Sequence, residues 1–455
     1  MGKQVYLFRP MRHRTSGQEG LASGRGQKNE PVPPRFQVKS SVTPASALPG
    51  GGSTVLTNLI ANDNRPQMSS KDQAVTPSVR RLSNPKTLAA ELPRWEGSAL
   101  AANAAMPTQT RAWIVACAET LIRDSELNVA LIEDAEGLAA LAPMVRRAGF
   151  PSGIELLGVR DLSEPSDLIY RDDRALTAIV RELSRDSTPM LLERVDALSP
   201  AVEAIRDGYR GKGVLVSHAG NNCPYITLGD AAKDVDQLVS GRLRSDLRRA
   251  ERRAQTDGKV TYEIHAPRSA AEFLPLFDQA LQVEAAGWKG RGGSAVAANE
   301  RQRAFFTRYG ILASEEGILR LAFMRIGGAV TAMQYAVQWN GAFWLLKIGY
   351  DEAYSKCSPG MLLIRHTLNY AMEQRLRSYE FLGSAESWTK RWTTTERSTA
   401  RISVYPFGPS AMFSLGRDVL RAARRKVAAR LETSRQREAA SDITEAISTS
   451  GAAGA

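Results

Sequence analysis

Three strand-like runs, followed by a helix and one more strand, constrain the fold of this chain most strongly. The runs ILRLAFMRI, AVTAMQYAVQW and AFWLLKIGYD lie within residues 318–351. Gly327-Gly328 joins the first two runs and Asn340-Gly341 joins the second two, and both dipeptides supply the positive φ that two-residue hairpin turns require. We therefore expect an antiparallel meander. The helix and the strand SYEFLG that follow predict a parallel pair with a right-handed crossover.

The start of that helix has the composition of an anion site. Ser358 is a good N-cap, Pro359 suits the first helical position, and Gly360 allows a ligand to approach the backbone closely. The unpaired N–H groups of the first turn and the helix dipole together favour a phosphate. The alternative is that Ser-Pro only begins a helix, as it does at Ser199-Pro200.

Composition divides the chain into four parts. The first 108 residues are rich in Pro, Gly, Ser, Asn and Gln and show no sustained period of 2 or 3.6, which predicts disorder. From Arg111 onward, short apolar runs alternate with helical patterns, as expected of an α/β fold. The predicted parts are a disordered N-terminal arm (1–108), an N-terminal half (109–240), a C-terminal half (241–410), and a basic helix with a disordered tail (411–455).

Periodicity predicts the elements of the two halves. In AEGLAALAPMVRRAG, residues 135–149, the side chains of Leu138, Leu141, Ala142 and Val145 would share one helical face. Ser269 and Glu272 form a capping-box pattern at the start of another helix. The remaining predictions are helices at WIVACAETLI and at residues 173–185, 200–209, 231–257, 269–284 and 300–315, and strands at IELLG, MLLERV, GVLVSHAG and VTYEIH.

Composition also excludes several classes of protein. No run approaches the roughly 18 to 20 consecutive apolar residues of a membrane helix, and the N-terminus lacks the apolar core of a secretory signal. We therefore expect a cytoplasmic protein. The three cysteines and four histidines are widely scattered, so neither a disulfide framework nor a metal site is expected. The net charge is +12, and residues 241–410 carry +8 of it, which suits an anionic ligand.

Four ordered motifs carry a resemblance to a known family. They are LRSDLRRAERRA, EAAGWKGRGGSAVA, LLKIGYDEAYSKCSPGMLL and YEFLGSAESWTKRW, within residues 240–400. This region resembles the acetyltransferases grouped with the cellulose-biosynthesis protein CelD, a branch of the GNAT superfamily related to the Fem peptidyltransferases. The resemblance implies two GNAT-like halves and transfer of an acyl group from acyl-CoA, most simply acetyl-CoA, without a metal. The implied acceptor is an amine or hydroxyl of a sugar or of a cell-envelope or exopolysaccharide precursor.

Acyl transfer from a thioester needs a bound donor, a base for the nucleophile and an acid for the leaving thiolate. Tyr350, at the end of the LLKIGYD strand, is the candidate acid, and the alternative is a tyrosine packed at a strand end. Glu284, ahead of a Gly-rich connection, is the candidate base, and the alternative is a solvated helix-end carboxylate. The candidate donor-binding residues are Ser358, Pro359, Gly360, Met361 and Leu362.

Other side chains are candidates for binding the acceptor. Trp288 and Lys289 lie in the Gly-rich connection, although Trp288 would serve equally as a core residue. Lys390 follows the last parallel strand and would hold a phosphate or carboxylate as a point charge, unless it is an ordinary surface lysine. The predicted acceptor-binding set is Trp288, Lys289, Lys347, Glu386, Lys390 and Trp392.

Two basic segments leave other partners open. Arg248, Arg249, Arg252 and Arg253 would suit tRNA binding in a Fem-like, aminoacyl-tRNA-dependent transferase, or they form the solvated side of an amphipathic helix. The segment 412–431 would lie on an anionic membrane surface, or it packs on its own domain. A non-catalytic accessory protein of polysaccharide synthesis is the remaining alternative.

Overall fold

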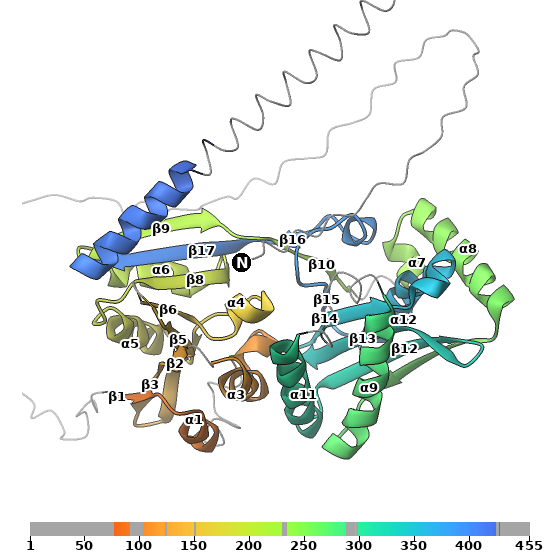
Figure 1. Ribbon diagram of the computed structural model, residues 1–455, viewed down its shortest axis with the longest axis horizontal. Helices are drawn as coiled ribbons and strands as arrows, with labels where there is room; N and C mark the ends of the chain where they lie inside the picture. The colour runs from red at the N-terminus through yellow and green to blue at the C-terminus, as the bar shows by residue number, and fades with distance from the viewer. Residues whose placement is uncertain are drawn as a thin grey trace, which may run out of the picture. The chain divides into compact units, whose positions relative to one another are not determined.

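The computed structural model of the protein describes residues 77–91, 103–122, 125–149, 152–229, 234–287, 296, 299–424 and 427 (Figure 1). Most of the predicted N-terminal arm and the end of the predicted tail lie outside these residues. So do Trp288 and Lys289 of the predicted acceptor loop. The described chain is a mixed α/β protein with two halves, each built of sheets flanked by helices, which confirms the predicted fold class.

The N-terminal half contains two sheets. Their strands are β1 Ser78–Leu82, β2 Ser125–Leu127, β3 Val129–Asp134, β4 Gly137–Ala142, β5 Met144–Arg147, β6 Gly153–Leu156, β7 Ile169–Tyr170, β8 Met190–Asp196, β9 Gly213–Ala219 and β17 Thr399–Pro406. One sheet has the order β1-β3-β4-β7 and the other has the order β2-β5-β6-β8-β17-β9. The helices of this half are α1 Pro85–Glu91, η2 Pro107–Gln109, α3 Arg111–Thr120, α4 Val159–Leu162, α5 Asp173–Leu183 and α6 Pro200–Gly208.

The C-terminal half is built on one seven-stranded sheet. Its strands are β10 Cys223–Thr227, β11 Val260–His265, β12 Leu319–Ile326, β13 Ala329–Trp339, β14 Ala342–Tyr350, β15 Ser378–Glu380 and β16 Glu396–Arg397. They lie in the order β11-β12-β13-β14-β15-β10-β16. The helices are α7 Val235–Leu238, α8 Gly241–Asp257, α9 Ala270–Ala286, α11 Glu300–Glu315, η4 Glu352–Cys357, α12 Pro359–Glu373 and η5 Thr389–Arg391. Residues 409–424 form a further helix.

The meander forms as the sequence predicts. β12 pairs antiparallel with β13, and β13 pairs antiparallel with β14. β14 pairs parallel with β15, and α12 connects these two strands. Gly327 and Gly328 have φ values of 57° and 89°, and Asn340 and Gly341 have φ values of 45° and 68°. Positive φ at both central residues is the turn geometry that matches the twist of paired strands. Local turn chemistry therefore fixed this part of the fold.

The two halves exchange strands. β10 lies next to β9 in the chain, yet it pairs antiparallel with β15 and with β16 in the C-terminal sheet. β17 comes near the end of the chain and pairs antiparallel with both β8 and β9 of the N-terminal half (Figure 1). The predicted boundaries at residues 240 and 410 therefore do not separate the sheets. Each half is completed by a strand from beyond the expected boundary.

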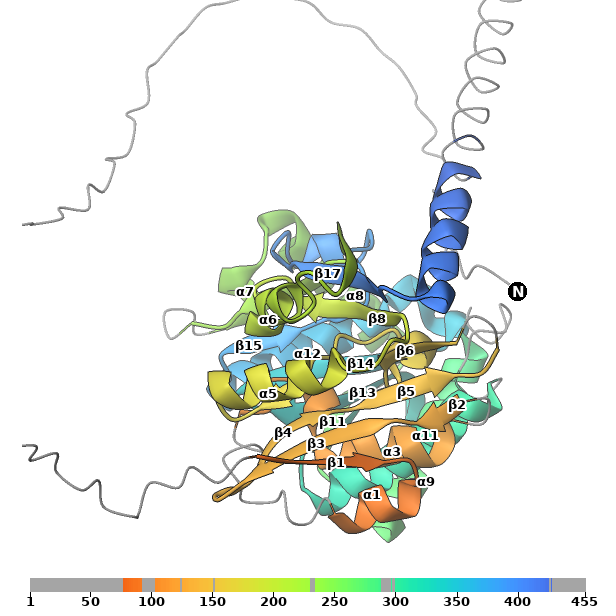
Figure 2. The same cartoon turned by 90° about the vertical axis from the view of Figure 1, so that its left-hand side faces the viewer.

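The predicted arm contains ordered elements that belong to the N-terminal half. β1 pairs antiparallel with β3 at the edge of the four-stranded sheet (Figure 2), and α1 follows it. Arg80 on β1 forms ion pairs with Glu91 of α1 at 2.7 Å and with Glu133 of β3 at 3.2 Å. The prediction of disorder up to residue 108 is wrong for this segment. Only Leu82 of the sequence SVRRL is buried, so the segment shows no periodicity. Its pairing with β3 makes it a strand.

The helix predicted over residues 135–149 is also wrong, because this segment forms β4 and β5. Its run LAALA is buried on both faces, and residues 139–142 are at most 1% exposed. A strand that is buried on both sides shows no alternation, so its apolar run resembles the face of a helix. The long helix predicted over 231–257 is likewise interrupted: Val239 is extended, and Ser240 then caps α8 by accepting a hydrogen bond from Leu243 N.

A shared core joins the halves. α3 of the N-terminal half packs beside α11 of the C-terminal half (Figure 1). Trp113 on α3 makes edge contacts with the rings of Phe305 and Tyr309 on α11, at centroid distances of 4.8 and 5.0 Å. All three side chains are at most 2% exposed. Because aromatic pairs of this kind add to the free energy of burial, α3 and α11 fix one half against the other.

Candidate functional site

β14 and β15 separate part of the way along the sheet. Their parallel pairing covers only Ala342 to Trp344 of β14 and ends at Trp344 and Glu380, although β14 continues to Tyr350. After Glu380 the chain turns away through Leu382 and Gly383, which have φ values of 58° and 57°. The second half of β14 thus has no strand partner on this side, and we call this unpaired stretch between the two strands the opening.

A β-bulge lies at the start of this opening. Tyr335 of β13 pairs with Lys347 and Ala336 pairs with Leu345, so Leu346 is an extra residue in β14. A bulge leaves one residue out of the ladder and redirects the side chains that follow it. The residues after the bulge stay paired with β13 and form the edge of the sheet at the opening.

Residues of β14 after the bulge point to opposite faces of the sheet. The Lys347 ammonium lies 4.9 Å from the centre of the Phe306 ring on α11. A Cβ added to Gly349 would lie 3.0 Å from Glu284 Cα on α9, so Gly349 faces the same side. Tyr350 lies on the other face, where its Cδ1 would be 3.6 Å from a Cβ on Gly360 of α12. The candidate acid Tyr350 and the candidate base Glu284 thus lie on opposite faces of β14.

The N-terminus of α12 lies on the Tyr350 face. Ser358 is its N-cap residue, but it has left-handed backbone angles (φ 48°, ψ 50°) and its side chain makes no capping hydrogen bond, unlike the predicted N-cap serine. The Ser358 carbonyl oxygen accepts from the amides of Met361 at 3.0 Å and Leu362 at 3.2 Å. Gly360 leaves the backbone open, since a Cβ there would make only an ordinary contact.

Cys357, next to this helix start, is held as a thiol. Its sulfur donates a hydrogen bond to Asp257 Oδ2 at 3.2 Å. Burial first, and the Asp257 carboxylate second, raise the pKa of Cys357 to about 11. Because the thiolate is the nucleophile, a cysteine with this pKa is poorly suited to covalent catalysis near neutral pH.

Glu284 is buried at the end of α9. It is 1% exposed, and its Oε2 accepts a hydrogen bond from the amide of Val296 at 2.9 Å. Val296 lies at the far end of the Gly-rich connection that contains Trp288 and Lys289. Glu284 therefore ties this connection to α9, close to Gly349 of β14.

The predicted residues after β15 have mixed environments. Glu386 Oε2 accepts from the Trp388 indole N–H at 2.9 Å, so its carboxylate is engaged within its own loop. Lys390 is exposed. Trp392 is 5% exposed and packs in the same core cluster as Phe381. The structure thus brings Lys390 to the surface and Trp392 into the core.

The arginines of α8 lie around a buried stripe. Leu243, Leu247, Ala250 and Ala254 are buried, as predicted. Asp246 forms ion pairs with Arg249 and Arg391, the latter at 2.7 Å. Arg253 donates to the Lys356 carbonyl at 2.7 Å, beside η4 and the start of α12, whereas Arg248 and Arg252 are exposed.

Sequence reasoning missed two charged residues of the N-terminal half that face this region. Arg194 on β8 donates from Nη2 to the Gly383 carbonyl at 2.7 Å, directly beside the point where β15 turns away. Glu164 is 7% exposed. Burial raises the pKa of its carboxyl, and the charges of Lys347 and Arg194 act in the opposite direction. No local pattern marks either residue, because the contacts that matter come from the other half of the chain.

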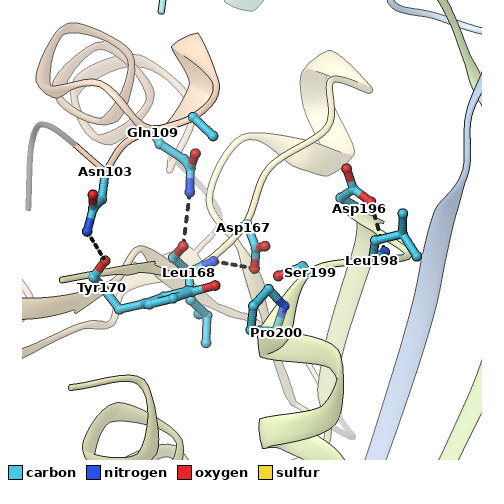
Figure 3. A pocket seen from close by; sticks show the side chains of 10 residues that line it. Asn103, Gln109, Asp167, Leu168, Tyr170, Asp196, Leu198, Ser199 and Pro200 are labelled. Atoms are coloured by element: carbon cyan, nitrogen blue, oxygen red, sulfur yellow. Dashed lines mark hydrogen bonds between the residues drawn. The ribbon is translucent and has the colours of Figure 1, made fainter. Parts of the chain in front are cut away.

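A pocket of about 330 Å³ lies in the N-terminal half. Figure 3 shows Asp167 inside it, with its carboxylate accepting from the Leu168 amide at 2.7 Å and lying close to Ser199. Burial raises the pKa of Asp167 to about 7, against the opposing effect of its hydrogen bonds. The wall at Ala105 adjoins the β13–β14 hairpin, where Asn340 Nδ2 donates to the Ala105 carbonyl at 3.3 Å. The pocket therefore adjoins the N-terminal end of β14, whereas Tyr350 lies at the C-terminal end of that strand.

Within the described ranges, no group of three His, Cys, Asp or Glu side chains is arranged to hold a metal ion. No helix in the described part of the chain is long and apolar enough to cross a membrane.

Comparison with known proteins identifies the class of the C-terminal half. Residues 241–390 match the family described as the acetyltransferase (GNAT) domain. This stretch contains Tyr350, the start of α12 and both strands of the opening. The chain therefore carries a GNAT-type acetyltransferase domain. No curated protein matches the chain.

Several solved structures align with 72–74% of this chain at low similarity. FemX is similar with a TM-score of 0.47 and 11% identity, over 72% of this chain and 97% of its own. A tandem GNAT protein from the clavulanic acid pathway has a TM-score of 0.42 and 14% identity, over 74% and 100%. L-PGS from Bacillus licheniformis has a TM-score of 0.44 and 12% identity, over 73% and 95%. At these identities and TM-scores the alignments carry no conclusion on family or activity, and the match to the GNAT domain rests on residues 241–390.

Proposed function

We propose that this protein transfers an acyl group from acyl-CoA, most simply acetyl-CoA, to an amine or hydroxyl of a sugar or of a cell-envelope or exopolysaccharide precursor. The observation that carries the proposal is the opening between β14 and β15, with the N-terminus of α12 on one face, inside the residues matched by the GNAT domain. The CelD-type motifs of the sequence support the class of acceptor. Attack would be direct, with donor and acceptor bound together.

On the donor side, the backbone amide of Gly360 would hold the pyrophosphate, because a helix N-terminus offers N–H groups and a favourable dipole. The Met361 amide would join it in place of its hydrogen bond to the Ser358 carbonyl oxygen. Ser358, Pro359 and Leu362 would shape this turn. Tyr350 lies against Gly360 and would donate its phenolic proton to the leaving thiolate.

On the acceptor side, Lys347 lies on the opposite face of β14. Glu284, which is buried and accepts from Val296, is better suited to positioning the Gly-rich connection than to acting as the base. Trp288 and Lys289 of that connection would contact the acceptor. Glu386 and Lys390 would contribute from the loop after β15, with Trp392 as the packed support beneath them.

Isothermal titration of the full chain with acetyl-CoA and with CoA tests the donor site. We expect micromolar binding to the parent and to Gly360→Ala, because a Cβ at Gly360 fits. Gly360→Asp should lose binding by at least about tenfold, since its carboxylate would repel the pyrophosphate. A parent chain that binds neither ligand would contradict the acyl-CoA proposal.

A Fem-like, aminoacyl-tRNA-dependent transfer is the second candidate. The exposed Arg248 and Arg252 of α8, a helix that packs against α12, favour it. Binding of tRNA that weakens steeply with salt and competes with CoA would support this reading. If neither CoA nor tRNA binds, a non-catalytic role in polysaccharide synthesis becomes the working proposal.

The segment 412–431 would add a peripheral contact with an anionic membrane. Val419 and Leu420 are 59% and 51% exposed, beside the basic Arg417 and Arg421. Exposed apolar side chains flanked by arginines suit a negatively charged lipid surface. Co-sedimentation with phosphatidylglycerol vesicles, but not with phosphatidylcholine vesicles, would support this contact, and equal recovery with both would contradict it.

A further inference from the structure

The pocket of the N-terminal half lies where three segments that are far apart in the chain meet (Figure 3). Its walls come from the segment before α3, the stretch around β7, and the turn between β8 and α6. Its volume of about 330 Å³ lies within the range of small-molecule sites, about 300–1,000 Å³. None of the described residues that line it belongs to β14 or β15, so the pocket is separate from the opening.

Amide side chains hold the walls of the pocket in place. Gln109 Nε2 donates to the Leu168 carbonyl at 3.0 Å, and Gln109 Oε1 accepts from the Met106 amide at 3.0 Å. Asn103 Nδ2 donates to the Arg171 carbonyl at 2.6 Å. These bonds join the segment before α3 to the stretch around β7. The pocket is therefore preformed, as small-molecule sites usually are.

Asp167 is a buried carboxylate inside this pocket. Its side chain is 7% exposed and accepts from the Leu168 amide at 2.7 Å. Figure 3 shows Ser199 beside it, and the Ser199 hydroxyl acts to lower the pKa of Asp167. Asp167 forms no ion pair with any described residue. A buried carboxylate without a cation costs free energy, so stability alone would favour an asparagine at this position.

A second carboxylate, Asp196 at the end of β8, lines the same pocket. Its Oδ1 accepts from the Leu198 amide at 2.8 Å, and it has no ion pair within the described part of the chain. The charge of Asp196 raises the pKa of Asp167, which shows that the two carboxylates repel each other. The pocket therefore gathers negative charge that its own walls leave uncompensated.

The arginines around the pocket are paired elsewhere. Arg171, which follows β7, binds Asp134 at 2.5 Å. Arg397, whose charge interacts with Asp196, binds Glu380 at 2.6 Å. No Lys, Arg or His is among the described residues that line the pocket. Two like charges without a counter-charge attract a cation and repel an anion.

The other groups of the pocket favour an organic cation over a metal ion. Ca²⁺ and Mg²⁺ take about six to eight oxygen ligands, whereas no three His, Cys, Asp or Glu side chains gather to hold an ion within the described ranges. The hydroxyls of Tyr170 and Ser199 suit neutral hydrogen bonds with hydroxyl groups of a ligand. Leu198, which lines the pocket although it is 90% exposed, offers an apolar contact for a carbon skeleton.

We propose that this pocket binds a small organic cation, whose ammonium group lies on the carboxylate of Asp167 and whose hydroxyl groups meet Tyr170 and Ser199. An ammonium compensates the charge of the pocket and makes charge-assisted hydrogen bonds, which are roughly twice as strong as neutral ones. The inference goes beyond the proposed acyl transfer and does not depend on it.

Saturation-transfer NMR on the full chain at pH 7, observed on the ligand, tests the class of ligand. D-Glucosamine and D-glucose are the matched probes, because an ammonium group in one replaces a hydroxyl in the other, and D-glucuronate is the anionic probe. We expect glucosamine to receive at least about fivefold more saturation than glucose or glucuronate. Equal transfer to glucosamine and glucose, no transfer to either glucosamine or ethanolamine, or displacement of glucosamine by an equal concentration of MgCl₂ would each overturn the proposal.

Variants of the pocket show whether the probe binds there. Asp167→Asn keeps the acceptor for the Leu168 amide and removes the charge, so transfer to glucosamine should fall to the level of glucose. Asp196→Asn should weaken binding at least about fivefold, and it serves as the test if Asp167→Asn does not fold by circular dichroism. Glu203→Gln on α6 is the control, because Glu203 is exposed, pairs with Arg206 and does not line the pocket. Binding that persists in a folded Asp167→Asn or Asp196→Asn chain belongs to another site and overturns the proposal.

The pH dependence of binding gives a readout that a purely structural Asp167 would not change. Asp196 from β8 and Tyr170 from β7 are the titratable groups that face Asp167 among the described residues, and burial raises the pKa of Asp167 to about 7. An ammonium ligand favours the ionised carboxylate, so the Kd of glucosamine should fall about tenfold between pH 5.5 and pH 7. The Asp167→Asn chain should show no such change, and the same pH dependence in both chains would contradict the proposal.

Discussion

At the scale of single residues, the alternation of β14 organises the candidate site. Lys347 and Gly349 face α11 and α9, whereas Tyr350 faces Gly360 of α12. A donor bound at α12 and an acceptor bound beside Lys347 would meet only through the opening between β14 and β15. Tyr350 and Lys347 were predicted as site residues from their strand, but the sequence could not show that they serve different faces.

The variant Tyr350→Phe tests whether Tyr350 is the general acid that protonates the leaving thiolate. The ring and its contact with Gly360 are kept, so the Kd for acetyl-CoA should stay within about twofold. Loss of the phenolic proton should lower kcat by about 100-fold, the usual range for a general acid. Steady-state thiol release measures both, with Tyr354→Phe on the neighbouring η4 as the control. An unchanged kcat in Tyr350→Phe would remove Tyr350 from the mechanism.

Asp167 gives a pH-dependent prediction. Its folded-state pKa of about 7 lies above the ordinary value of 3.8, because burial penalises its charge. Its contribution to stability is therefore complete below about pH 4 and is lost as pH rises through about 7, by up to roughly 4 kcal/mol. Asp167→Asn keeps the hydrogen-bond acceptor without the charge, so its unfolding free energy should fall less between pH 5 and pH 8 than that of the parent.

Asp186 is the control in denaturant titrations, because its pKa shift has the opposite sign to that of Asp167. Although burial alone raises the pKa of Asp186, hydrogen bonds from Thr188 and the charge of Arg146 hold it below its ordinary value. Its stabilising effect is therefore present at neutral pH and lost on acidification. Asp186→Asn should lower stability at pH 7 and not at pH 3. The same slope for both variants would contradict the assignment of Asp167.

At the scale of elements, local chemistry predicted some segments and failed for others. The hairpins at Gly327-Gly328 and Asn340-Gly341 and the Ser269 cap of α9 follow from backbone preferences of a few residues. The strands β4 and β5 were mistaken for a helix because both faces of LAALA are buried. Burial on both faces removes the alternation that distinguishes a strand.

Gly310 of α11 gives a prediction for the packing of one element. A Cβ at this position would overlap the ring of Phe273 on α9, which is fully buried. Gly310→Ala gains about 1 kcal/mol of helix propensity but overpacks the core, so we expect a net loss of about 1–2 kcal/mol in unfolding free energy. Urea titration measures it. Adding Phe273→Leu should recover part of the loss, and a Gly310→Ala variant more stable than the parent would contradict this packing.

At the scale of the whole molecule, strand exchange makes the halves interdependent. β17 fills the place between β8 and β9, and β10 fills the place between β15 and β16. The residues matched by the GNAT domain, 241–390, contain neither strand. Tests of activity therefore need the full chain.

Truncation tests this interdependence. A chain ending at Ser398 lacks β17, so β8 and β9 would both lose a strand partner and the cooperative unfolding transition should disappear. A chain ending at Gly408 keeps β17 and should retain a single transition in thermal circular dichroism. Equal transitions in the two truncated chains would show that β17 is dispensable.

The sequence by itself determined the α/β class, the meander, and the helix start at Ser358–Gly360, because turn residues, capping residues and apolar periodicity act over a few neighbouring positions. It also indicated Tyr350 and Lys347 through their strand. Only the tertiary structure decided that β10 and β17 cross between the halves, and that Arg194 of β8 reaches Gly383 beyond the end of β15. Strand pairing and charge burial depend on residues as much as about two hundred and ten positions away, as in the pairing of β8 with β17, so no local pattern records them.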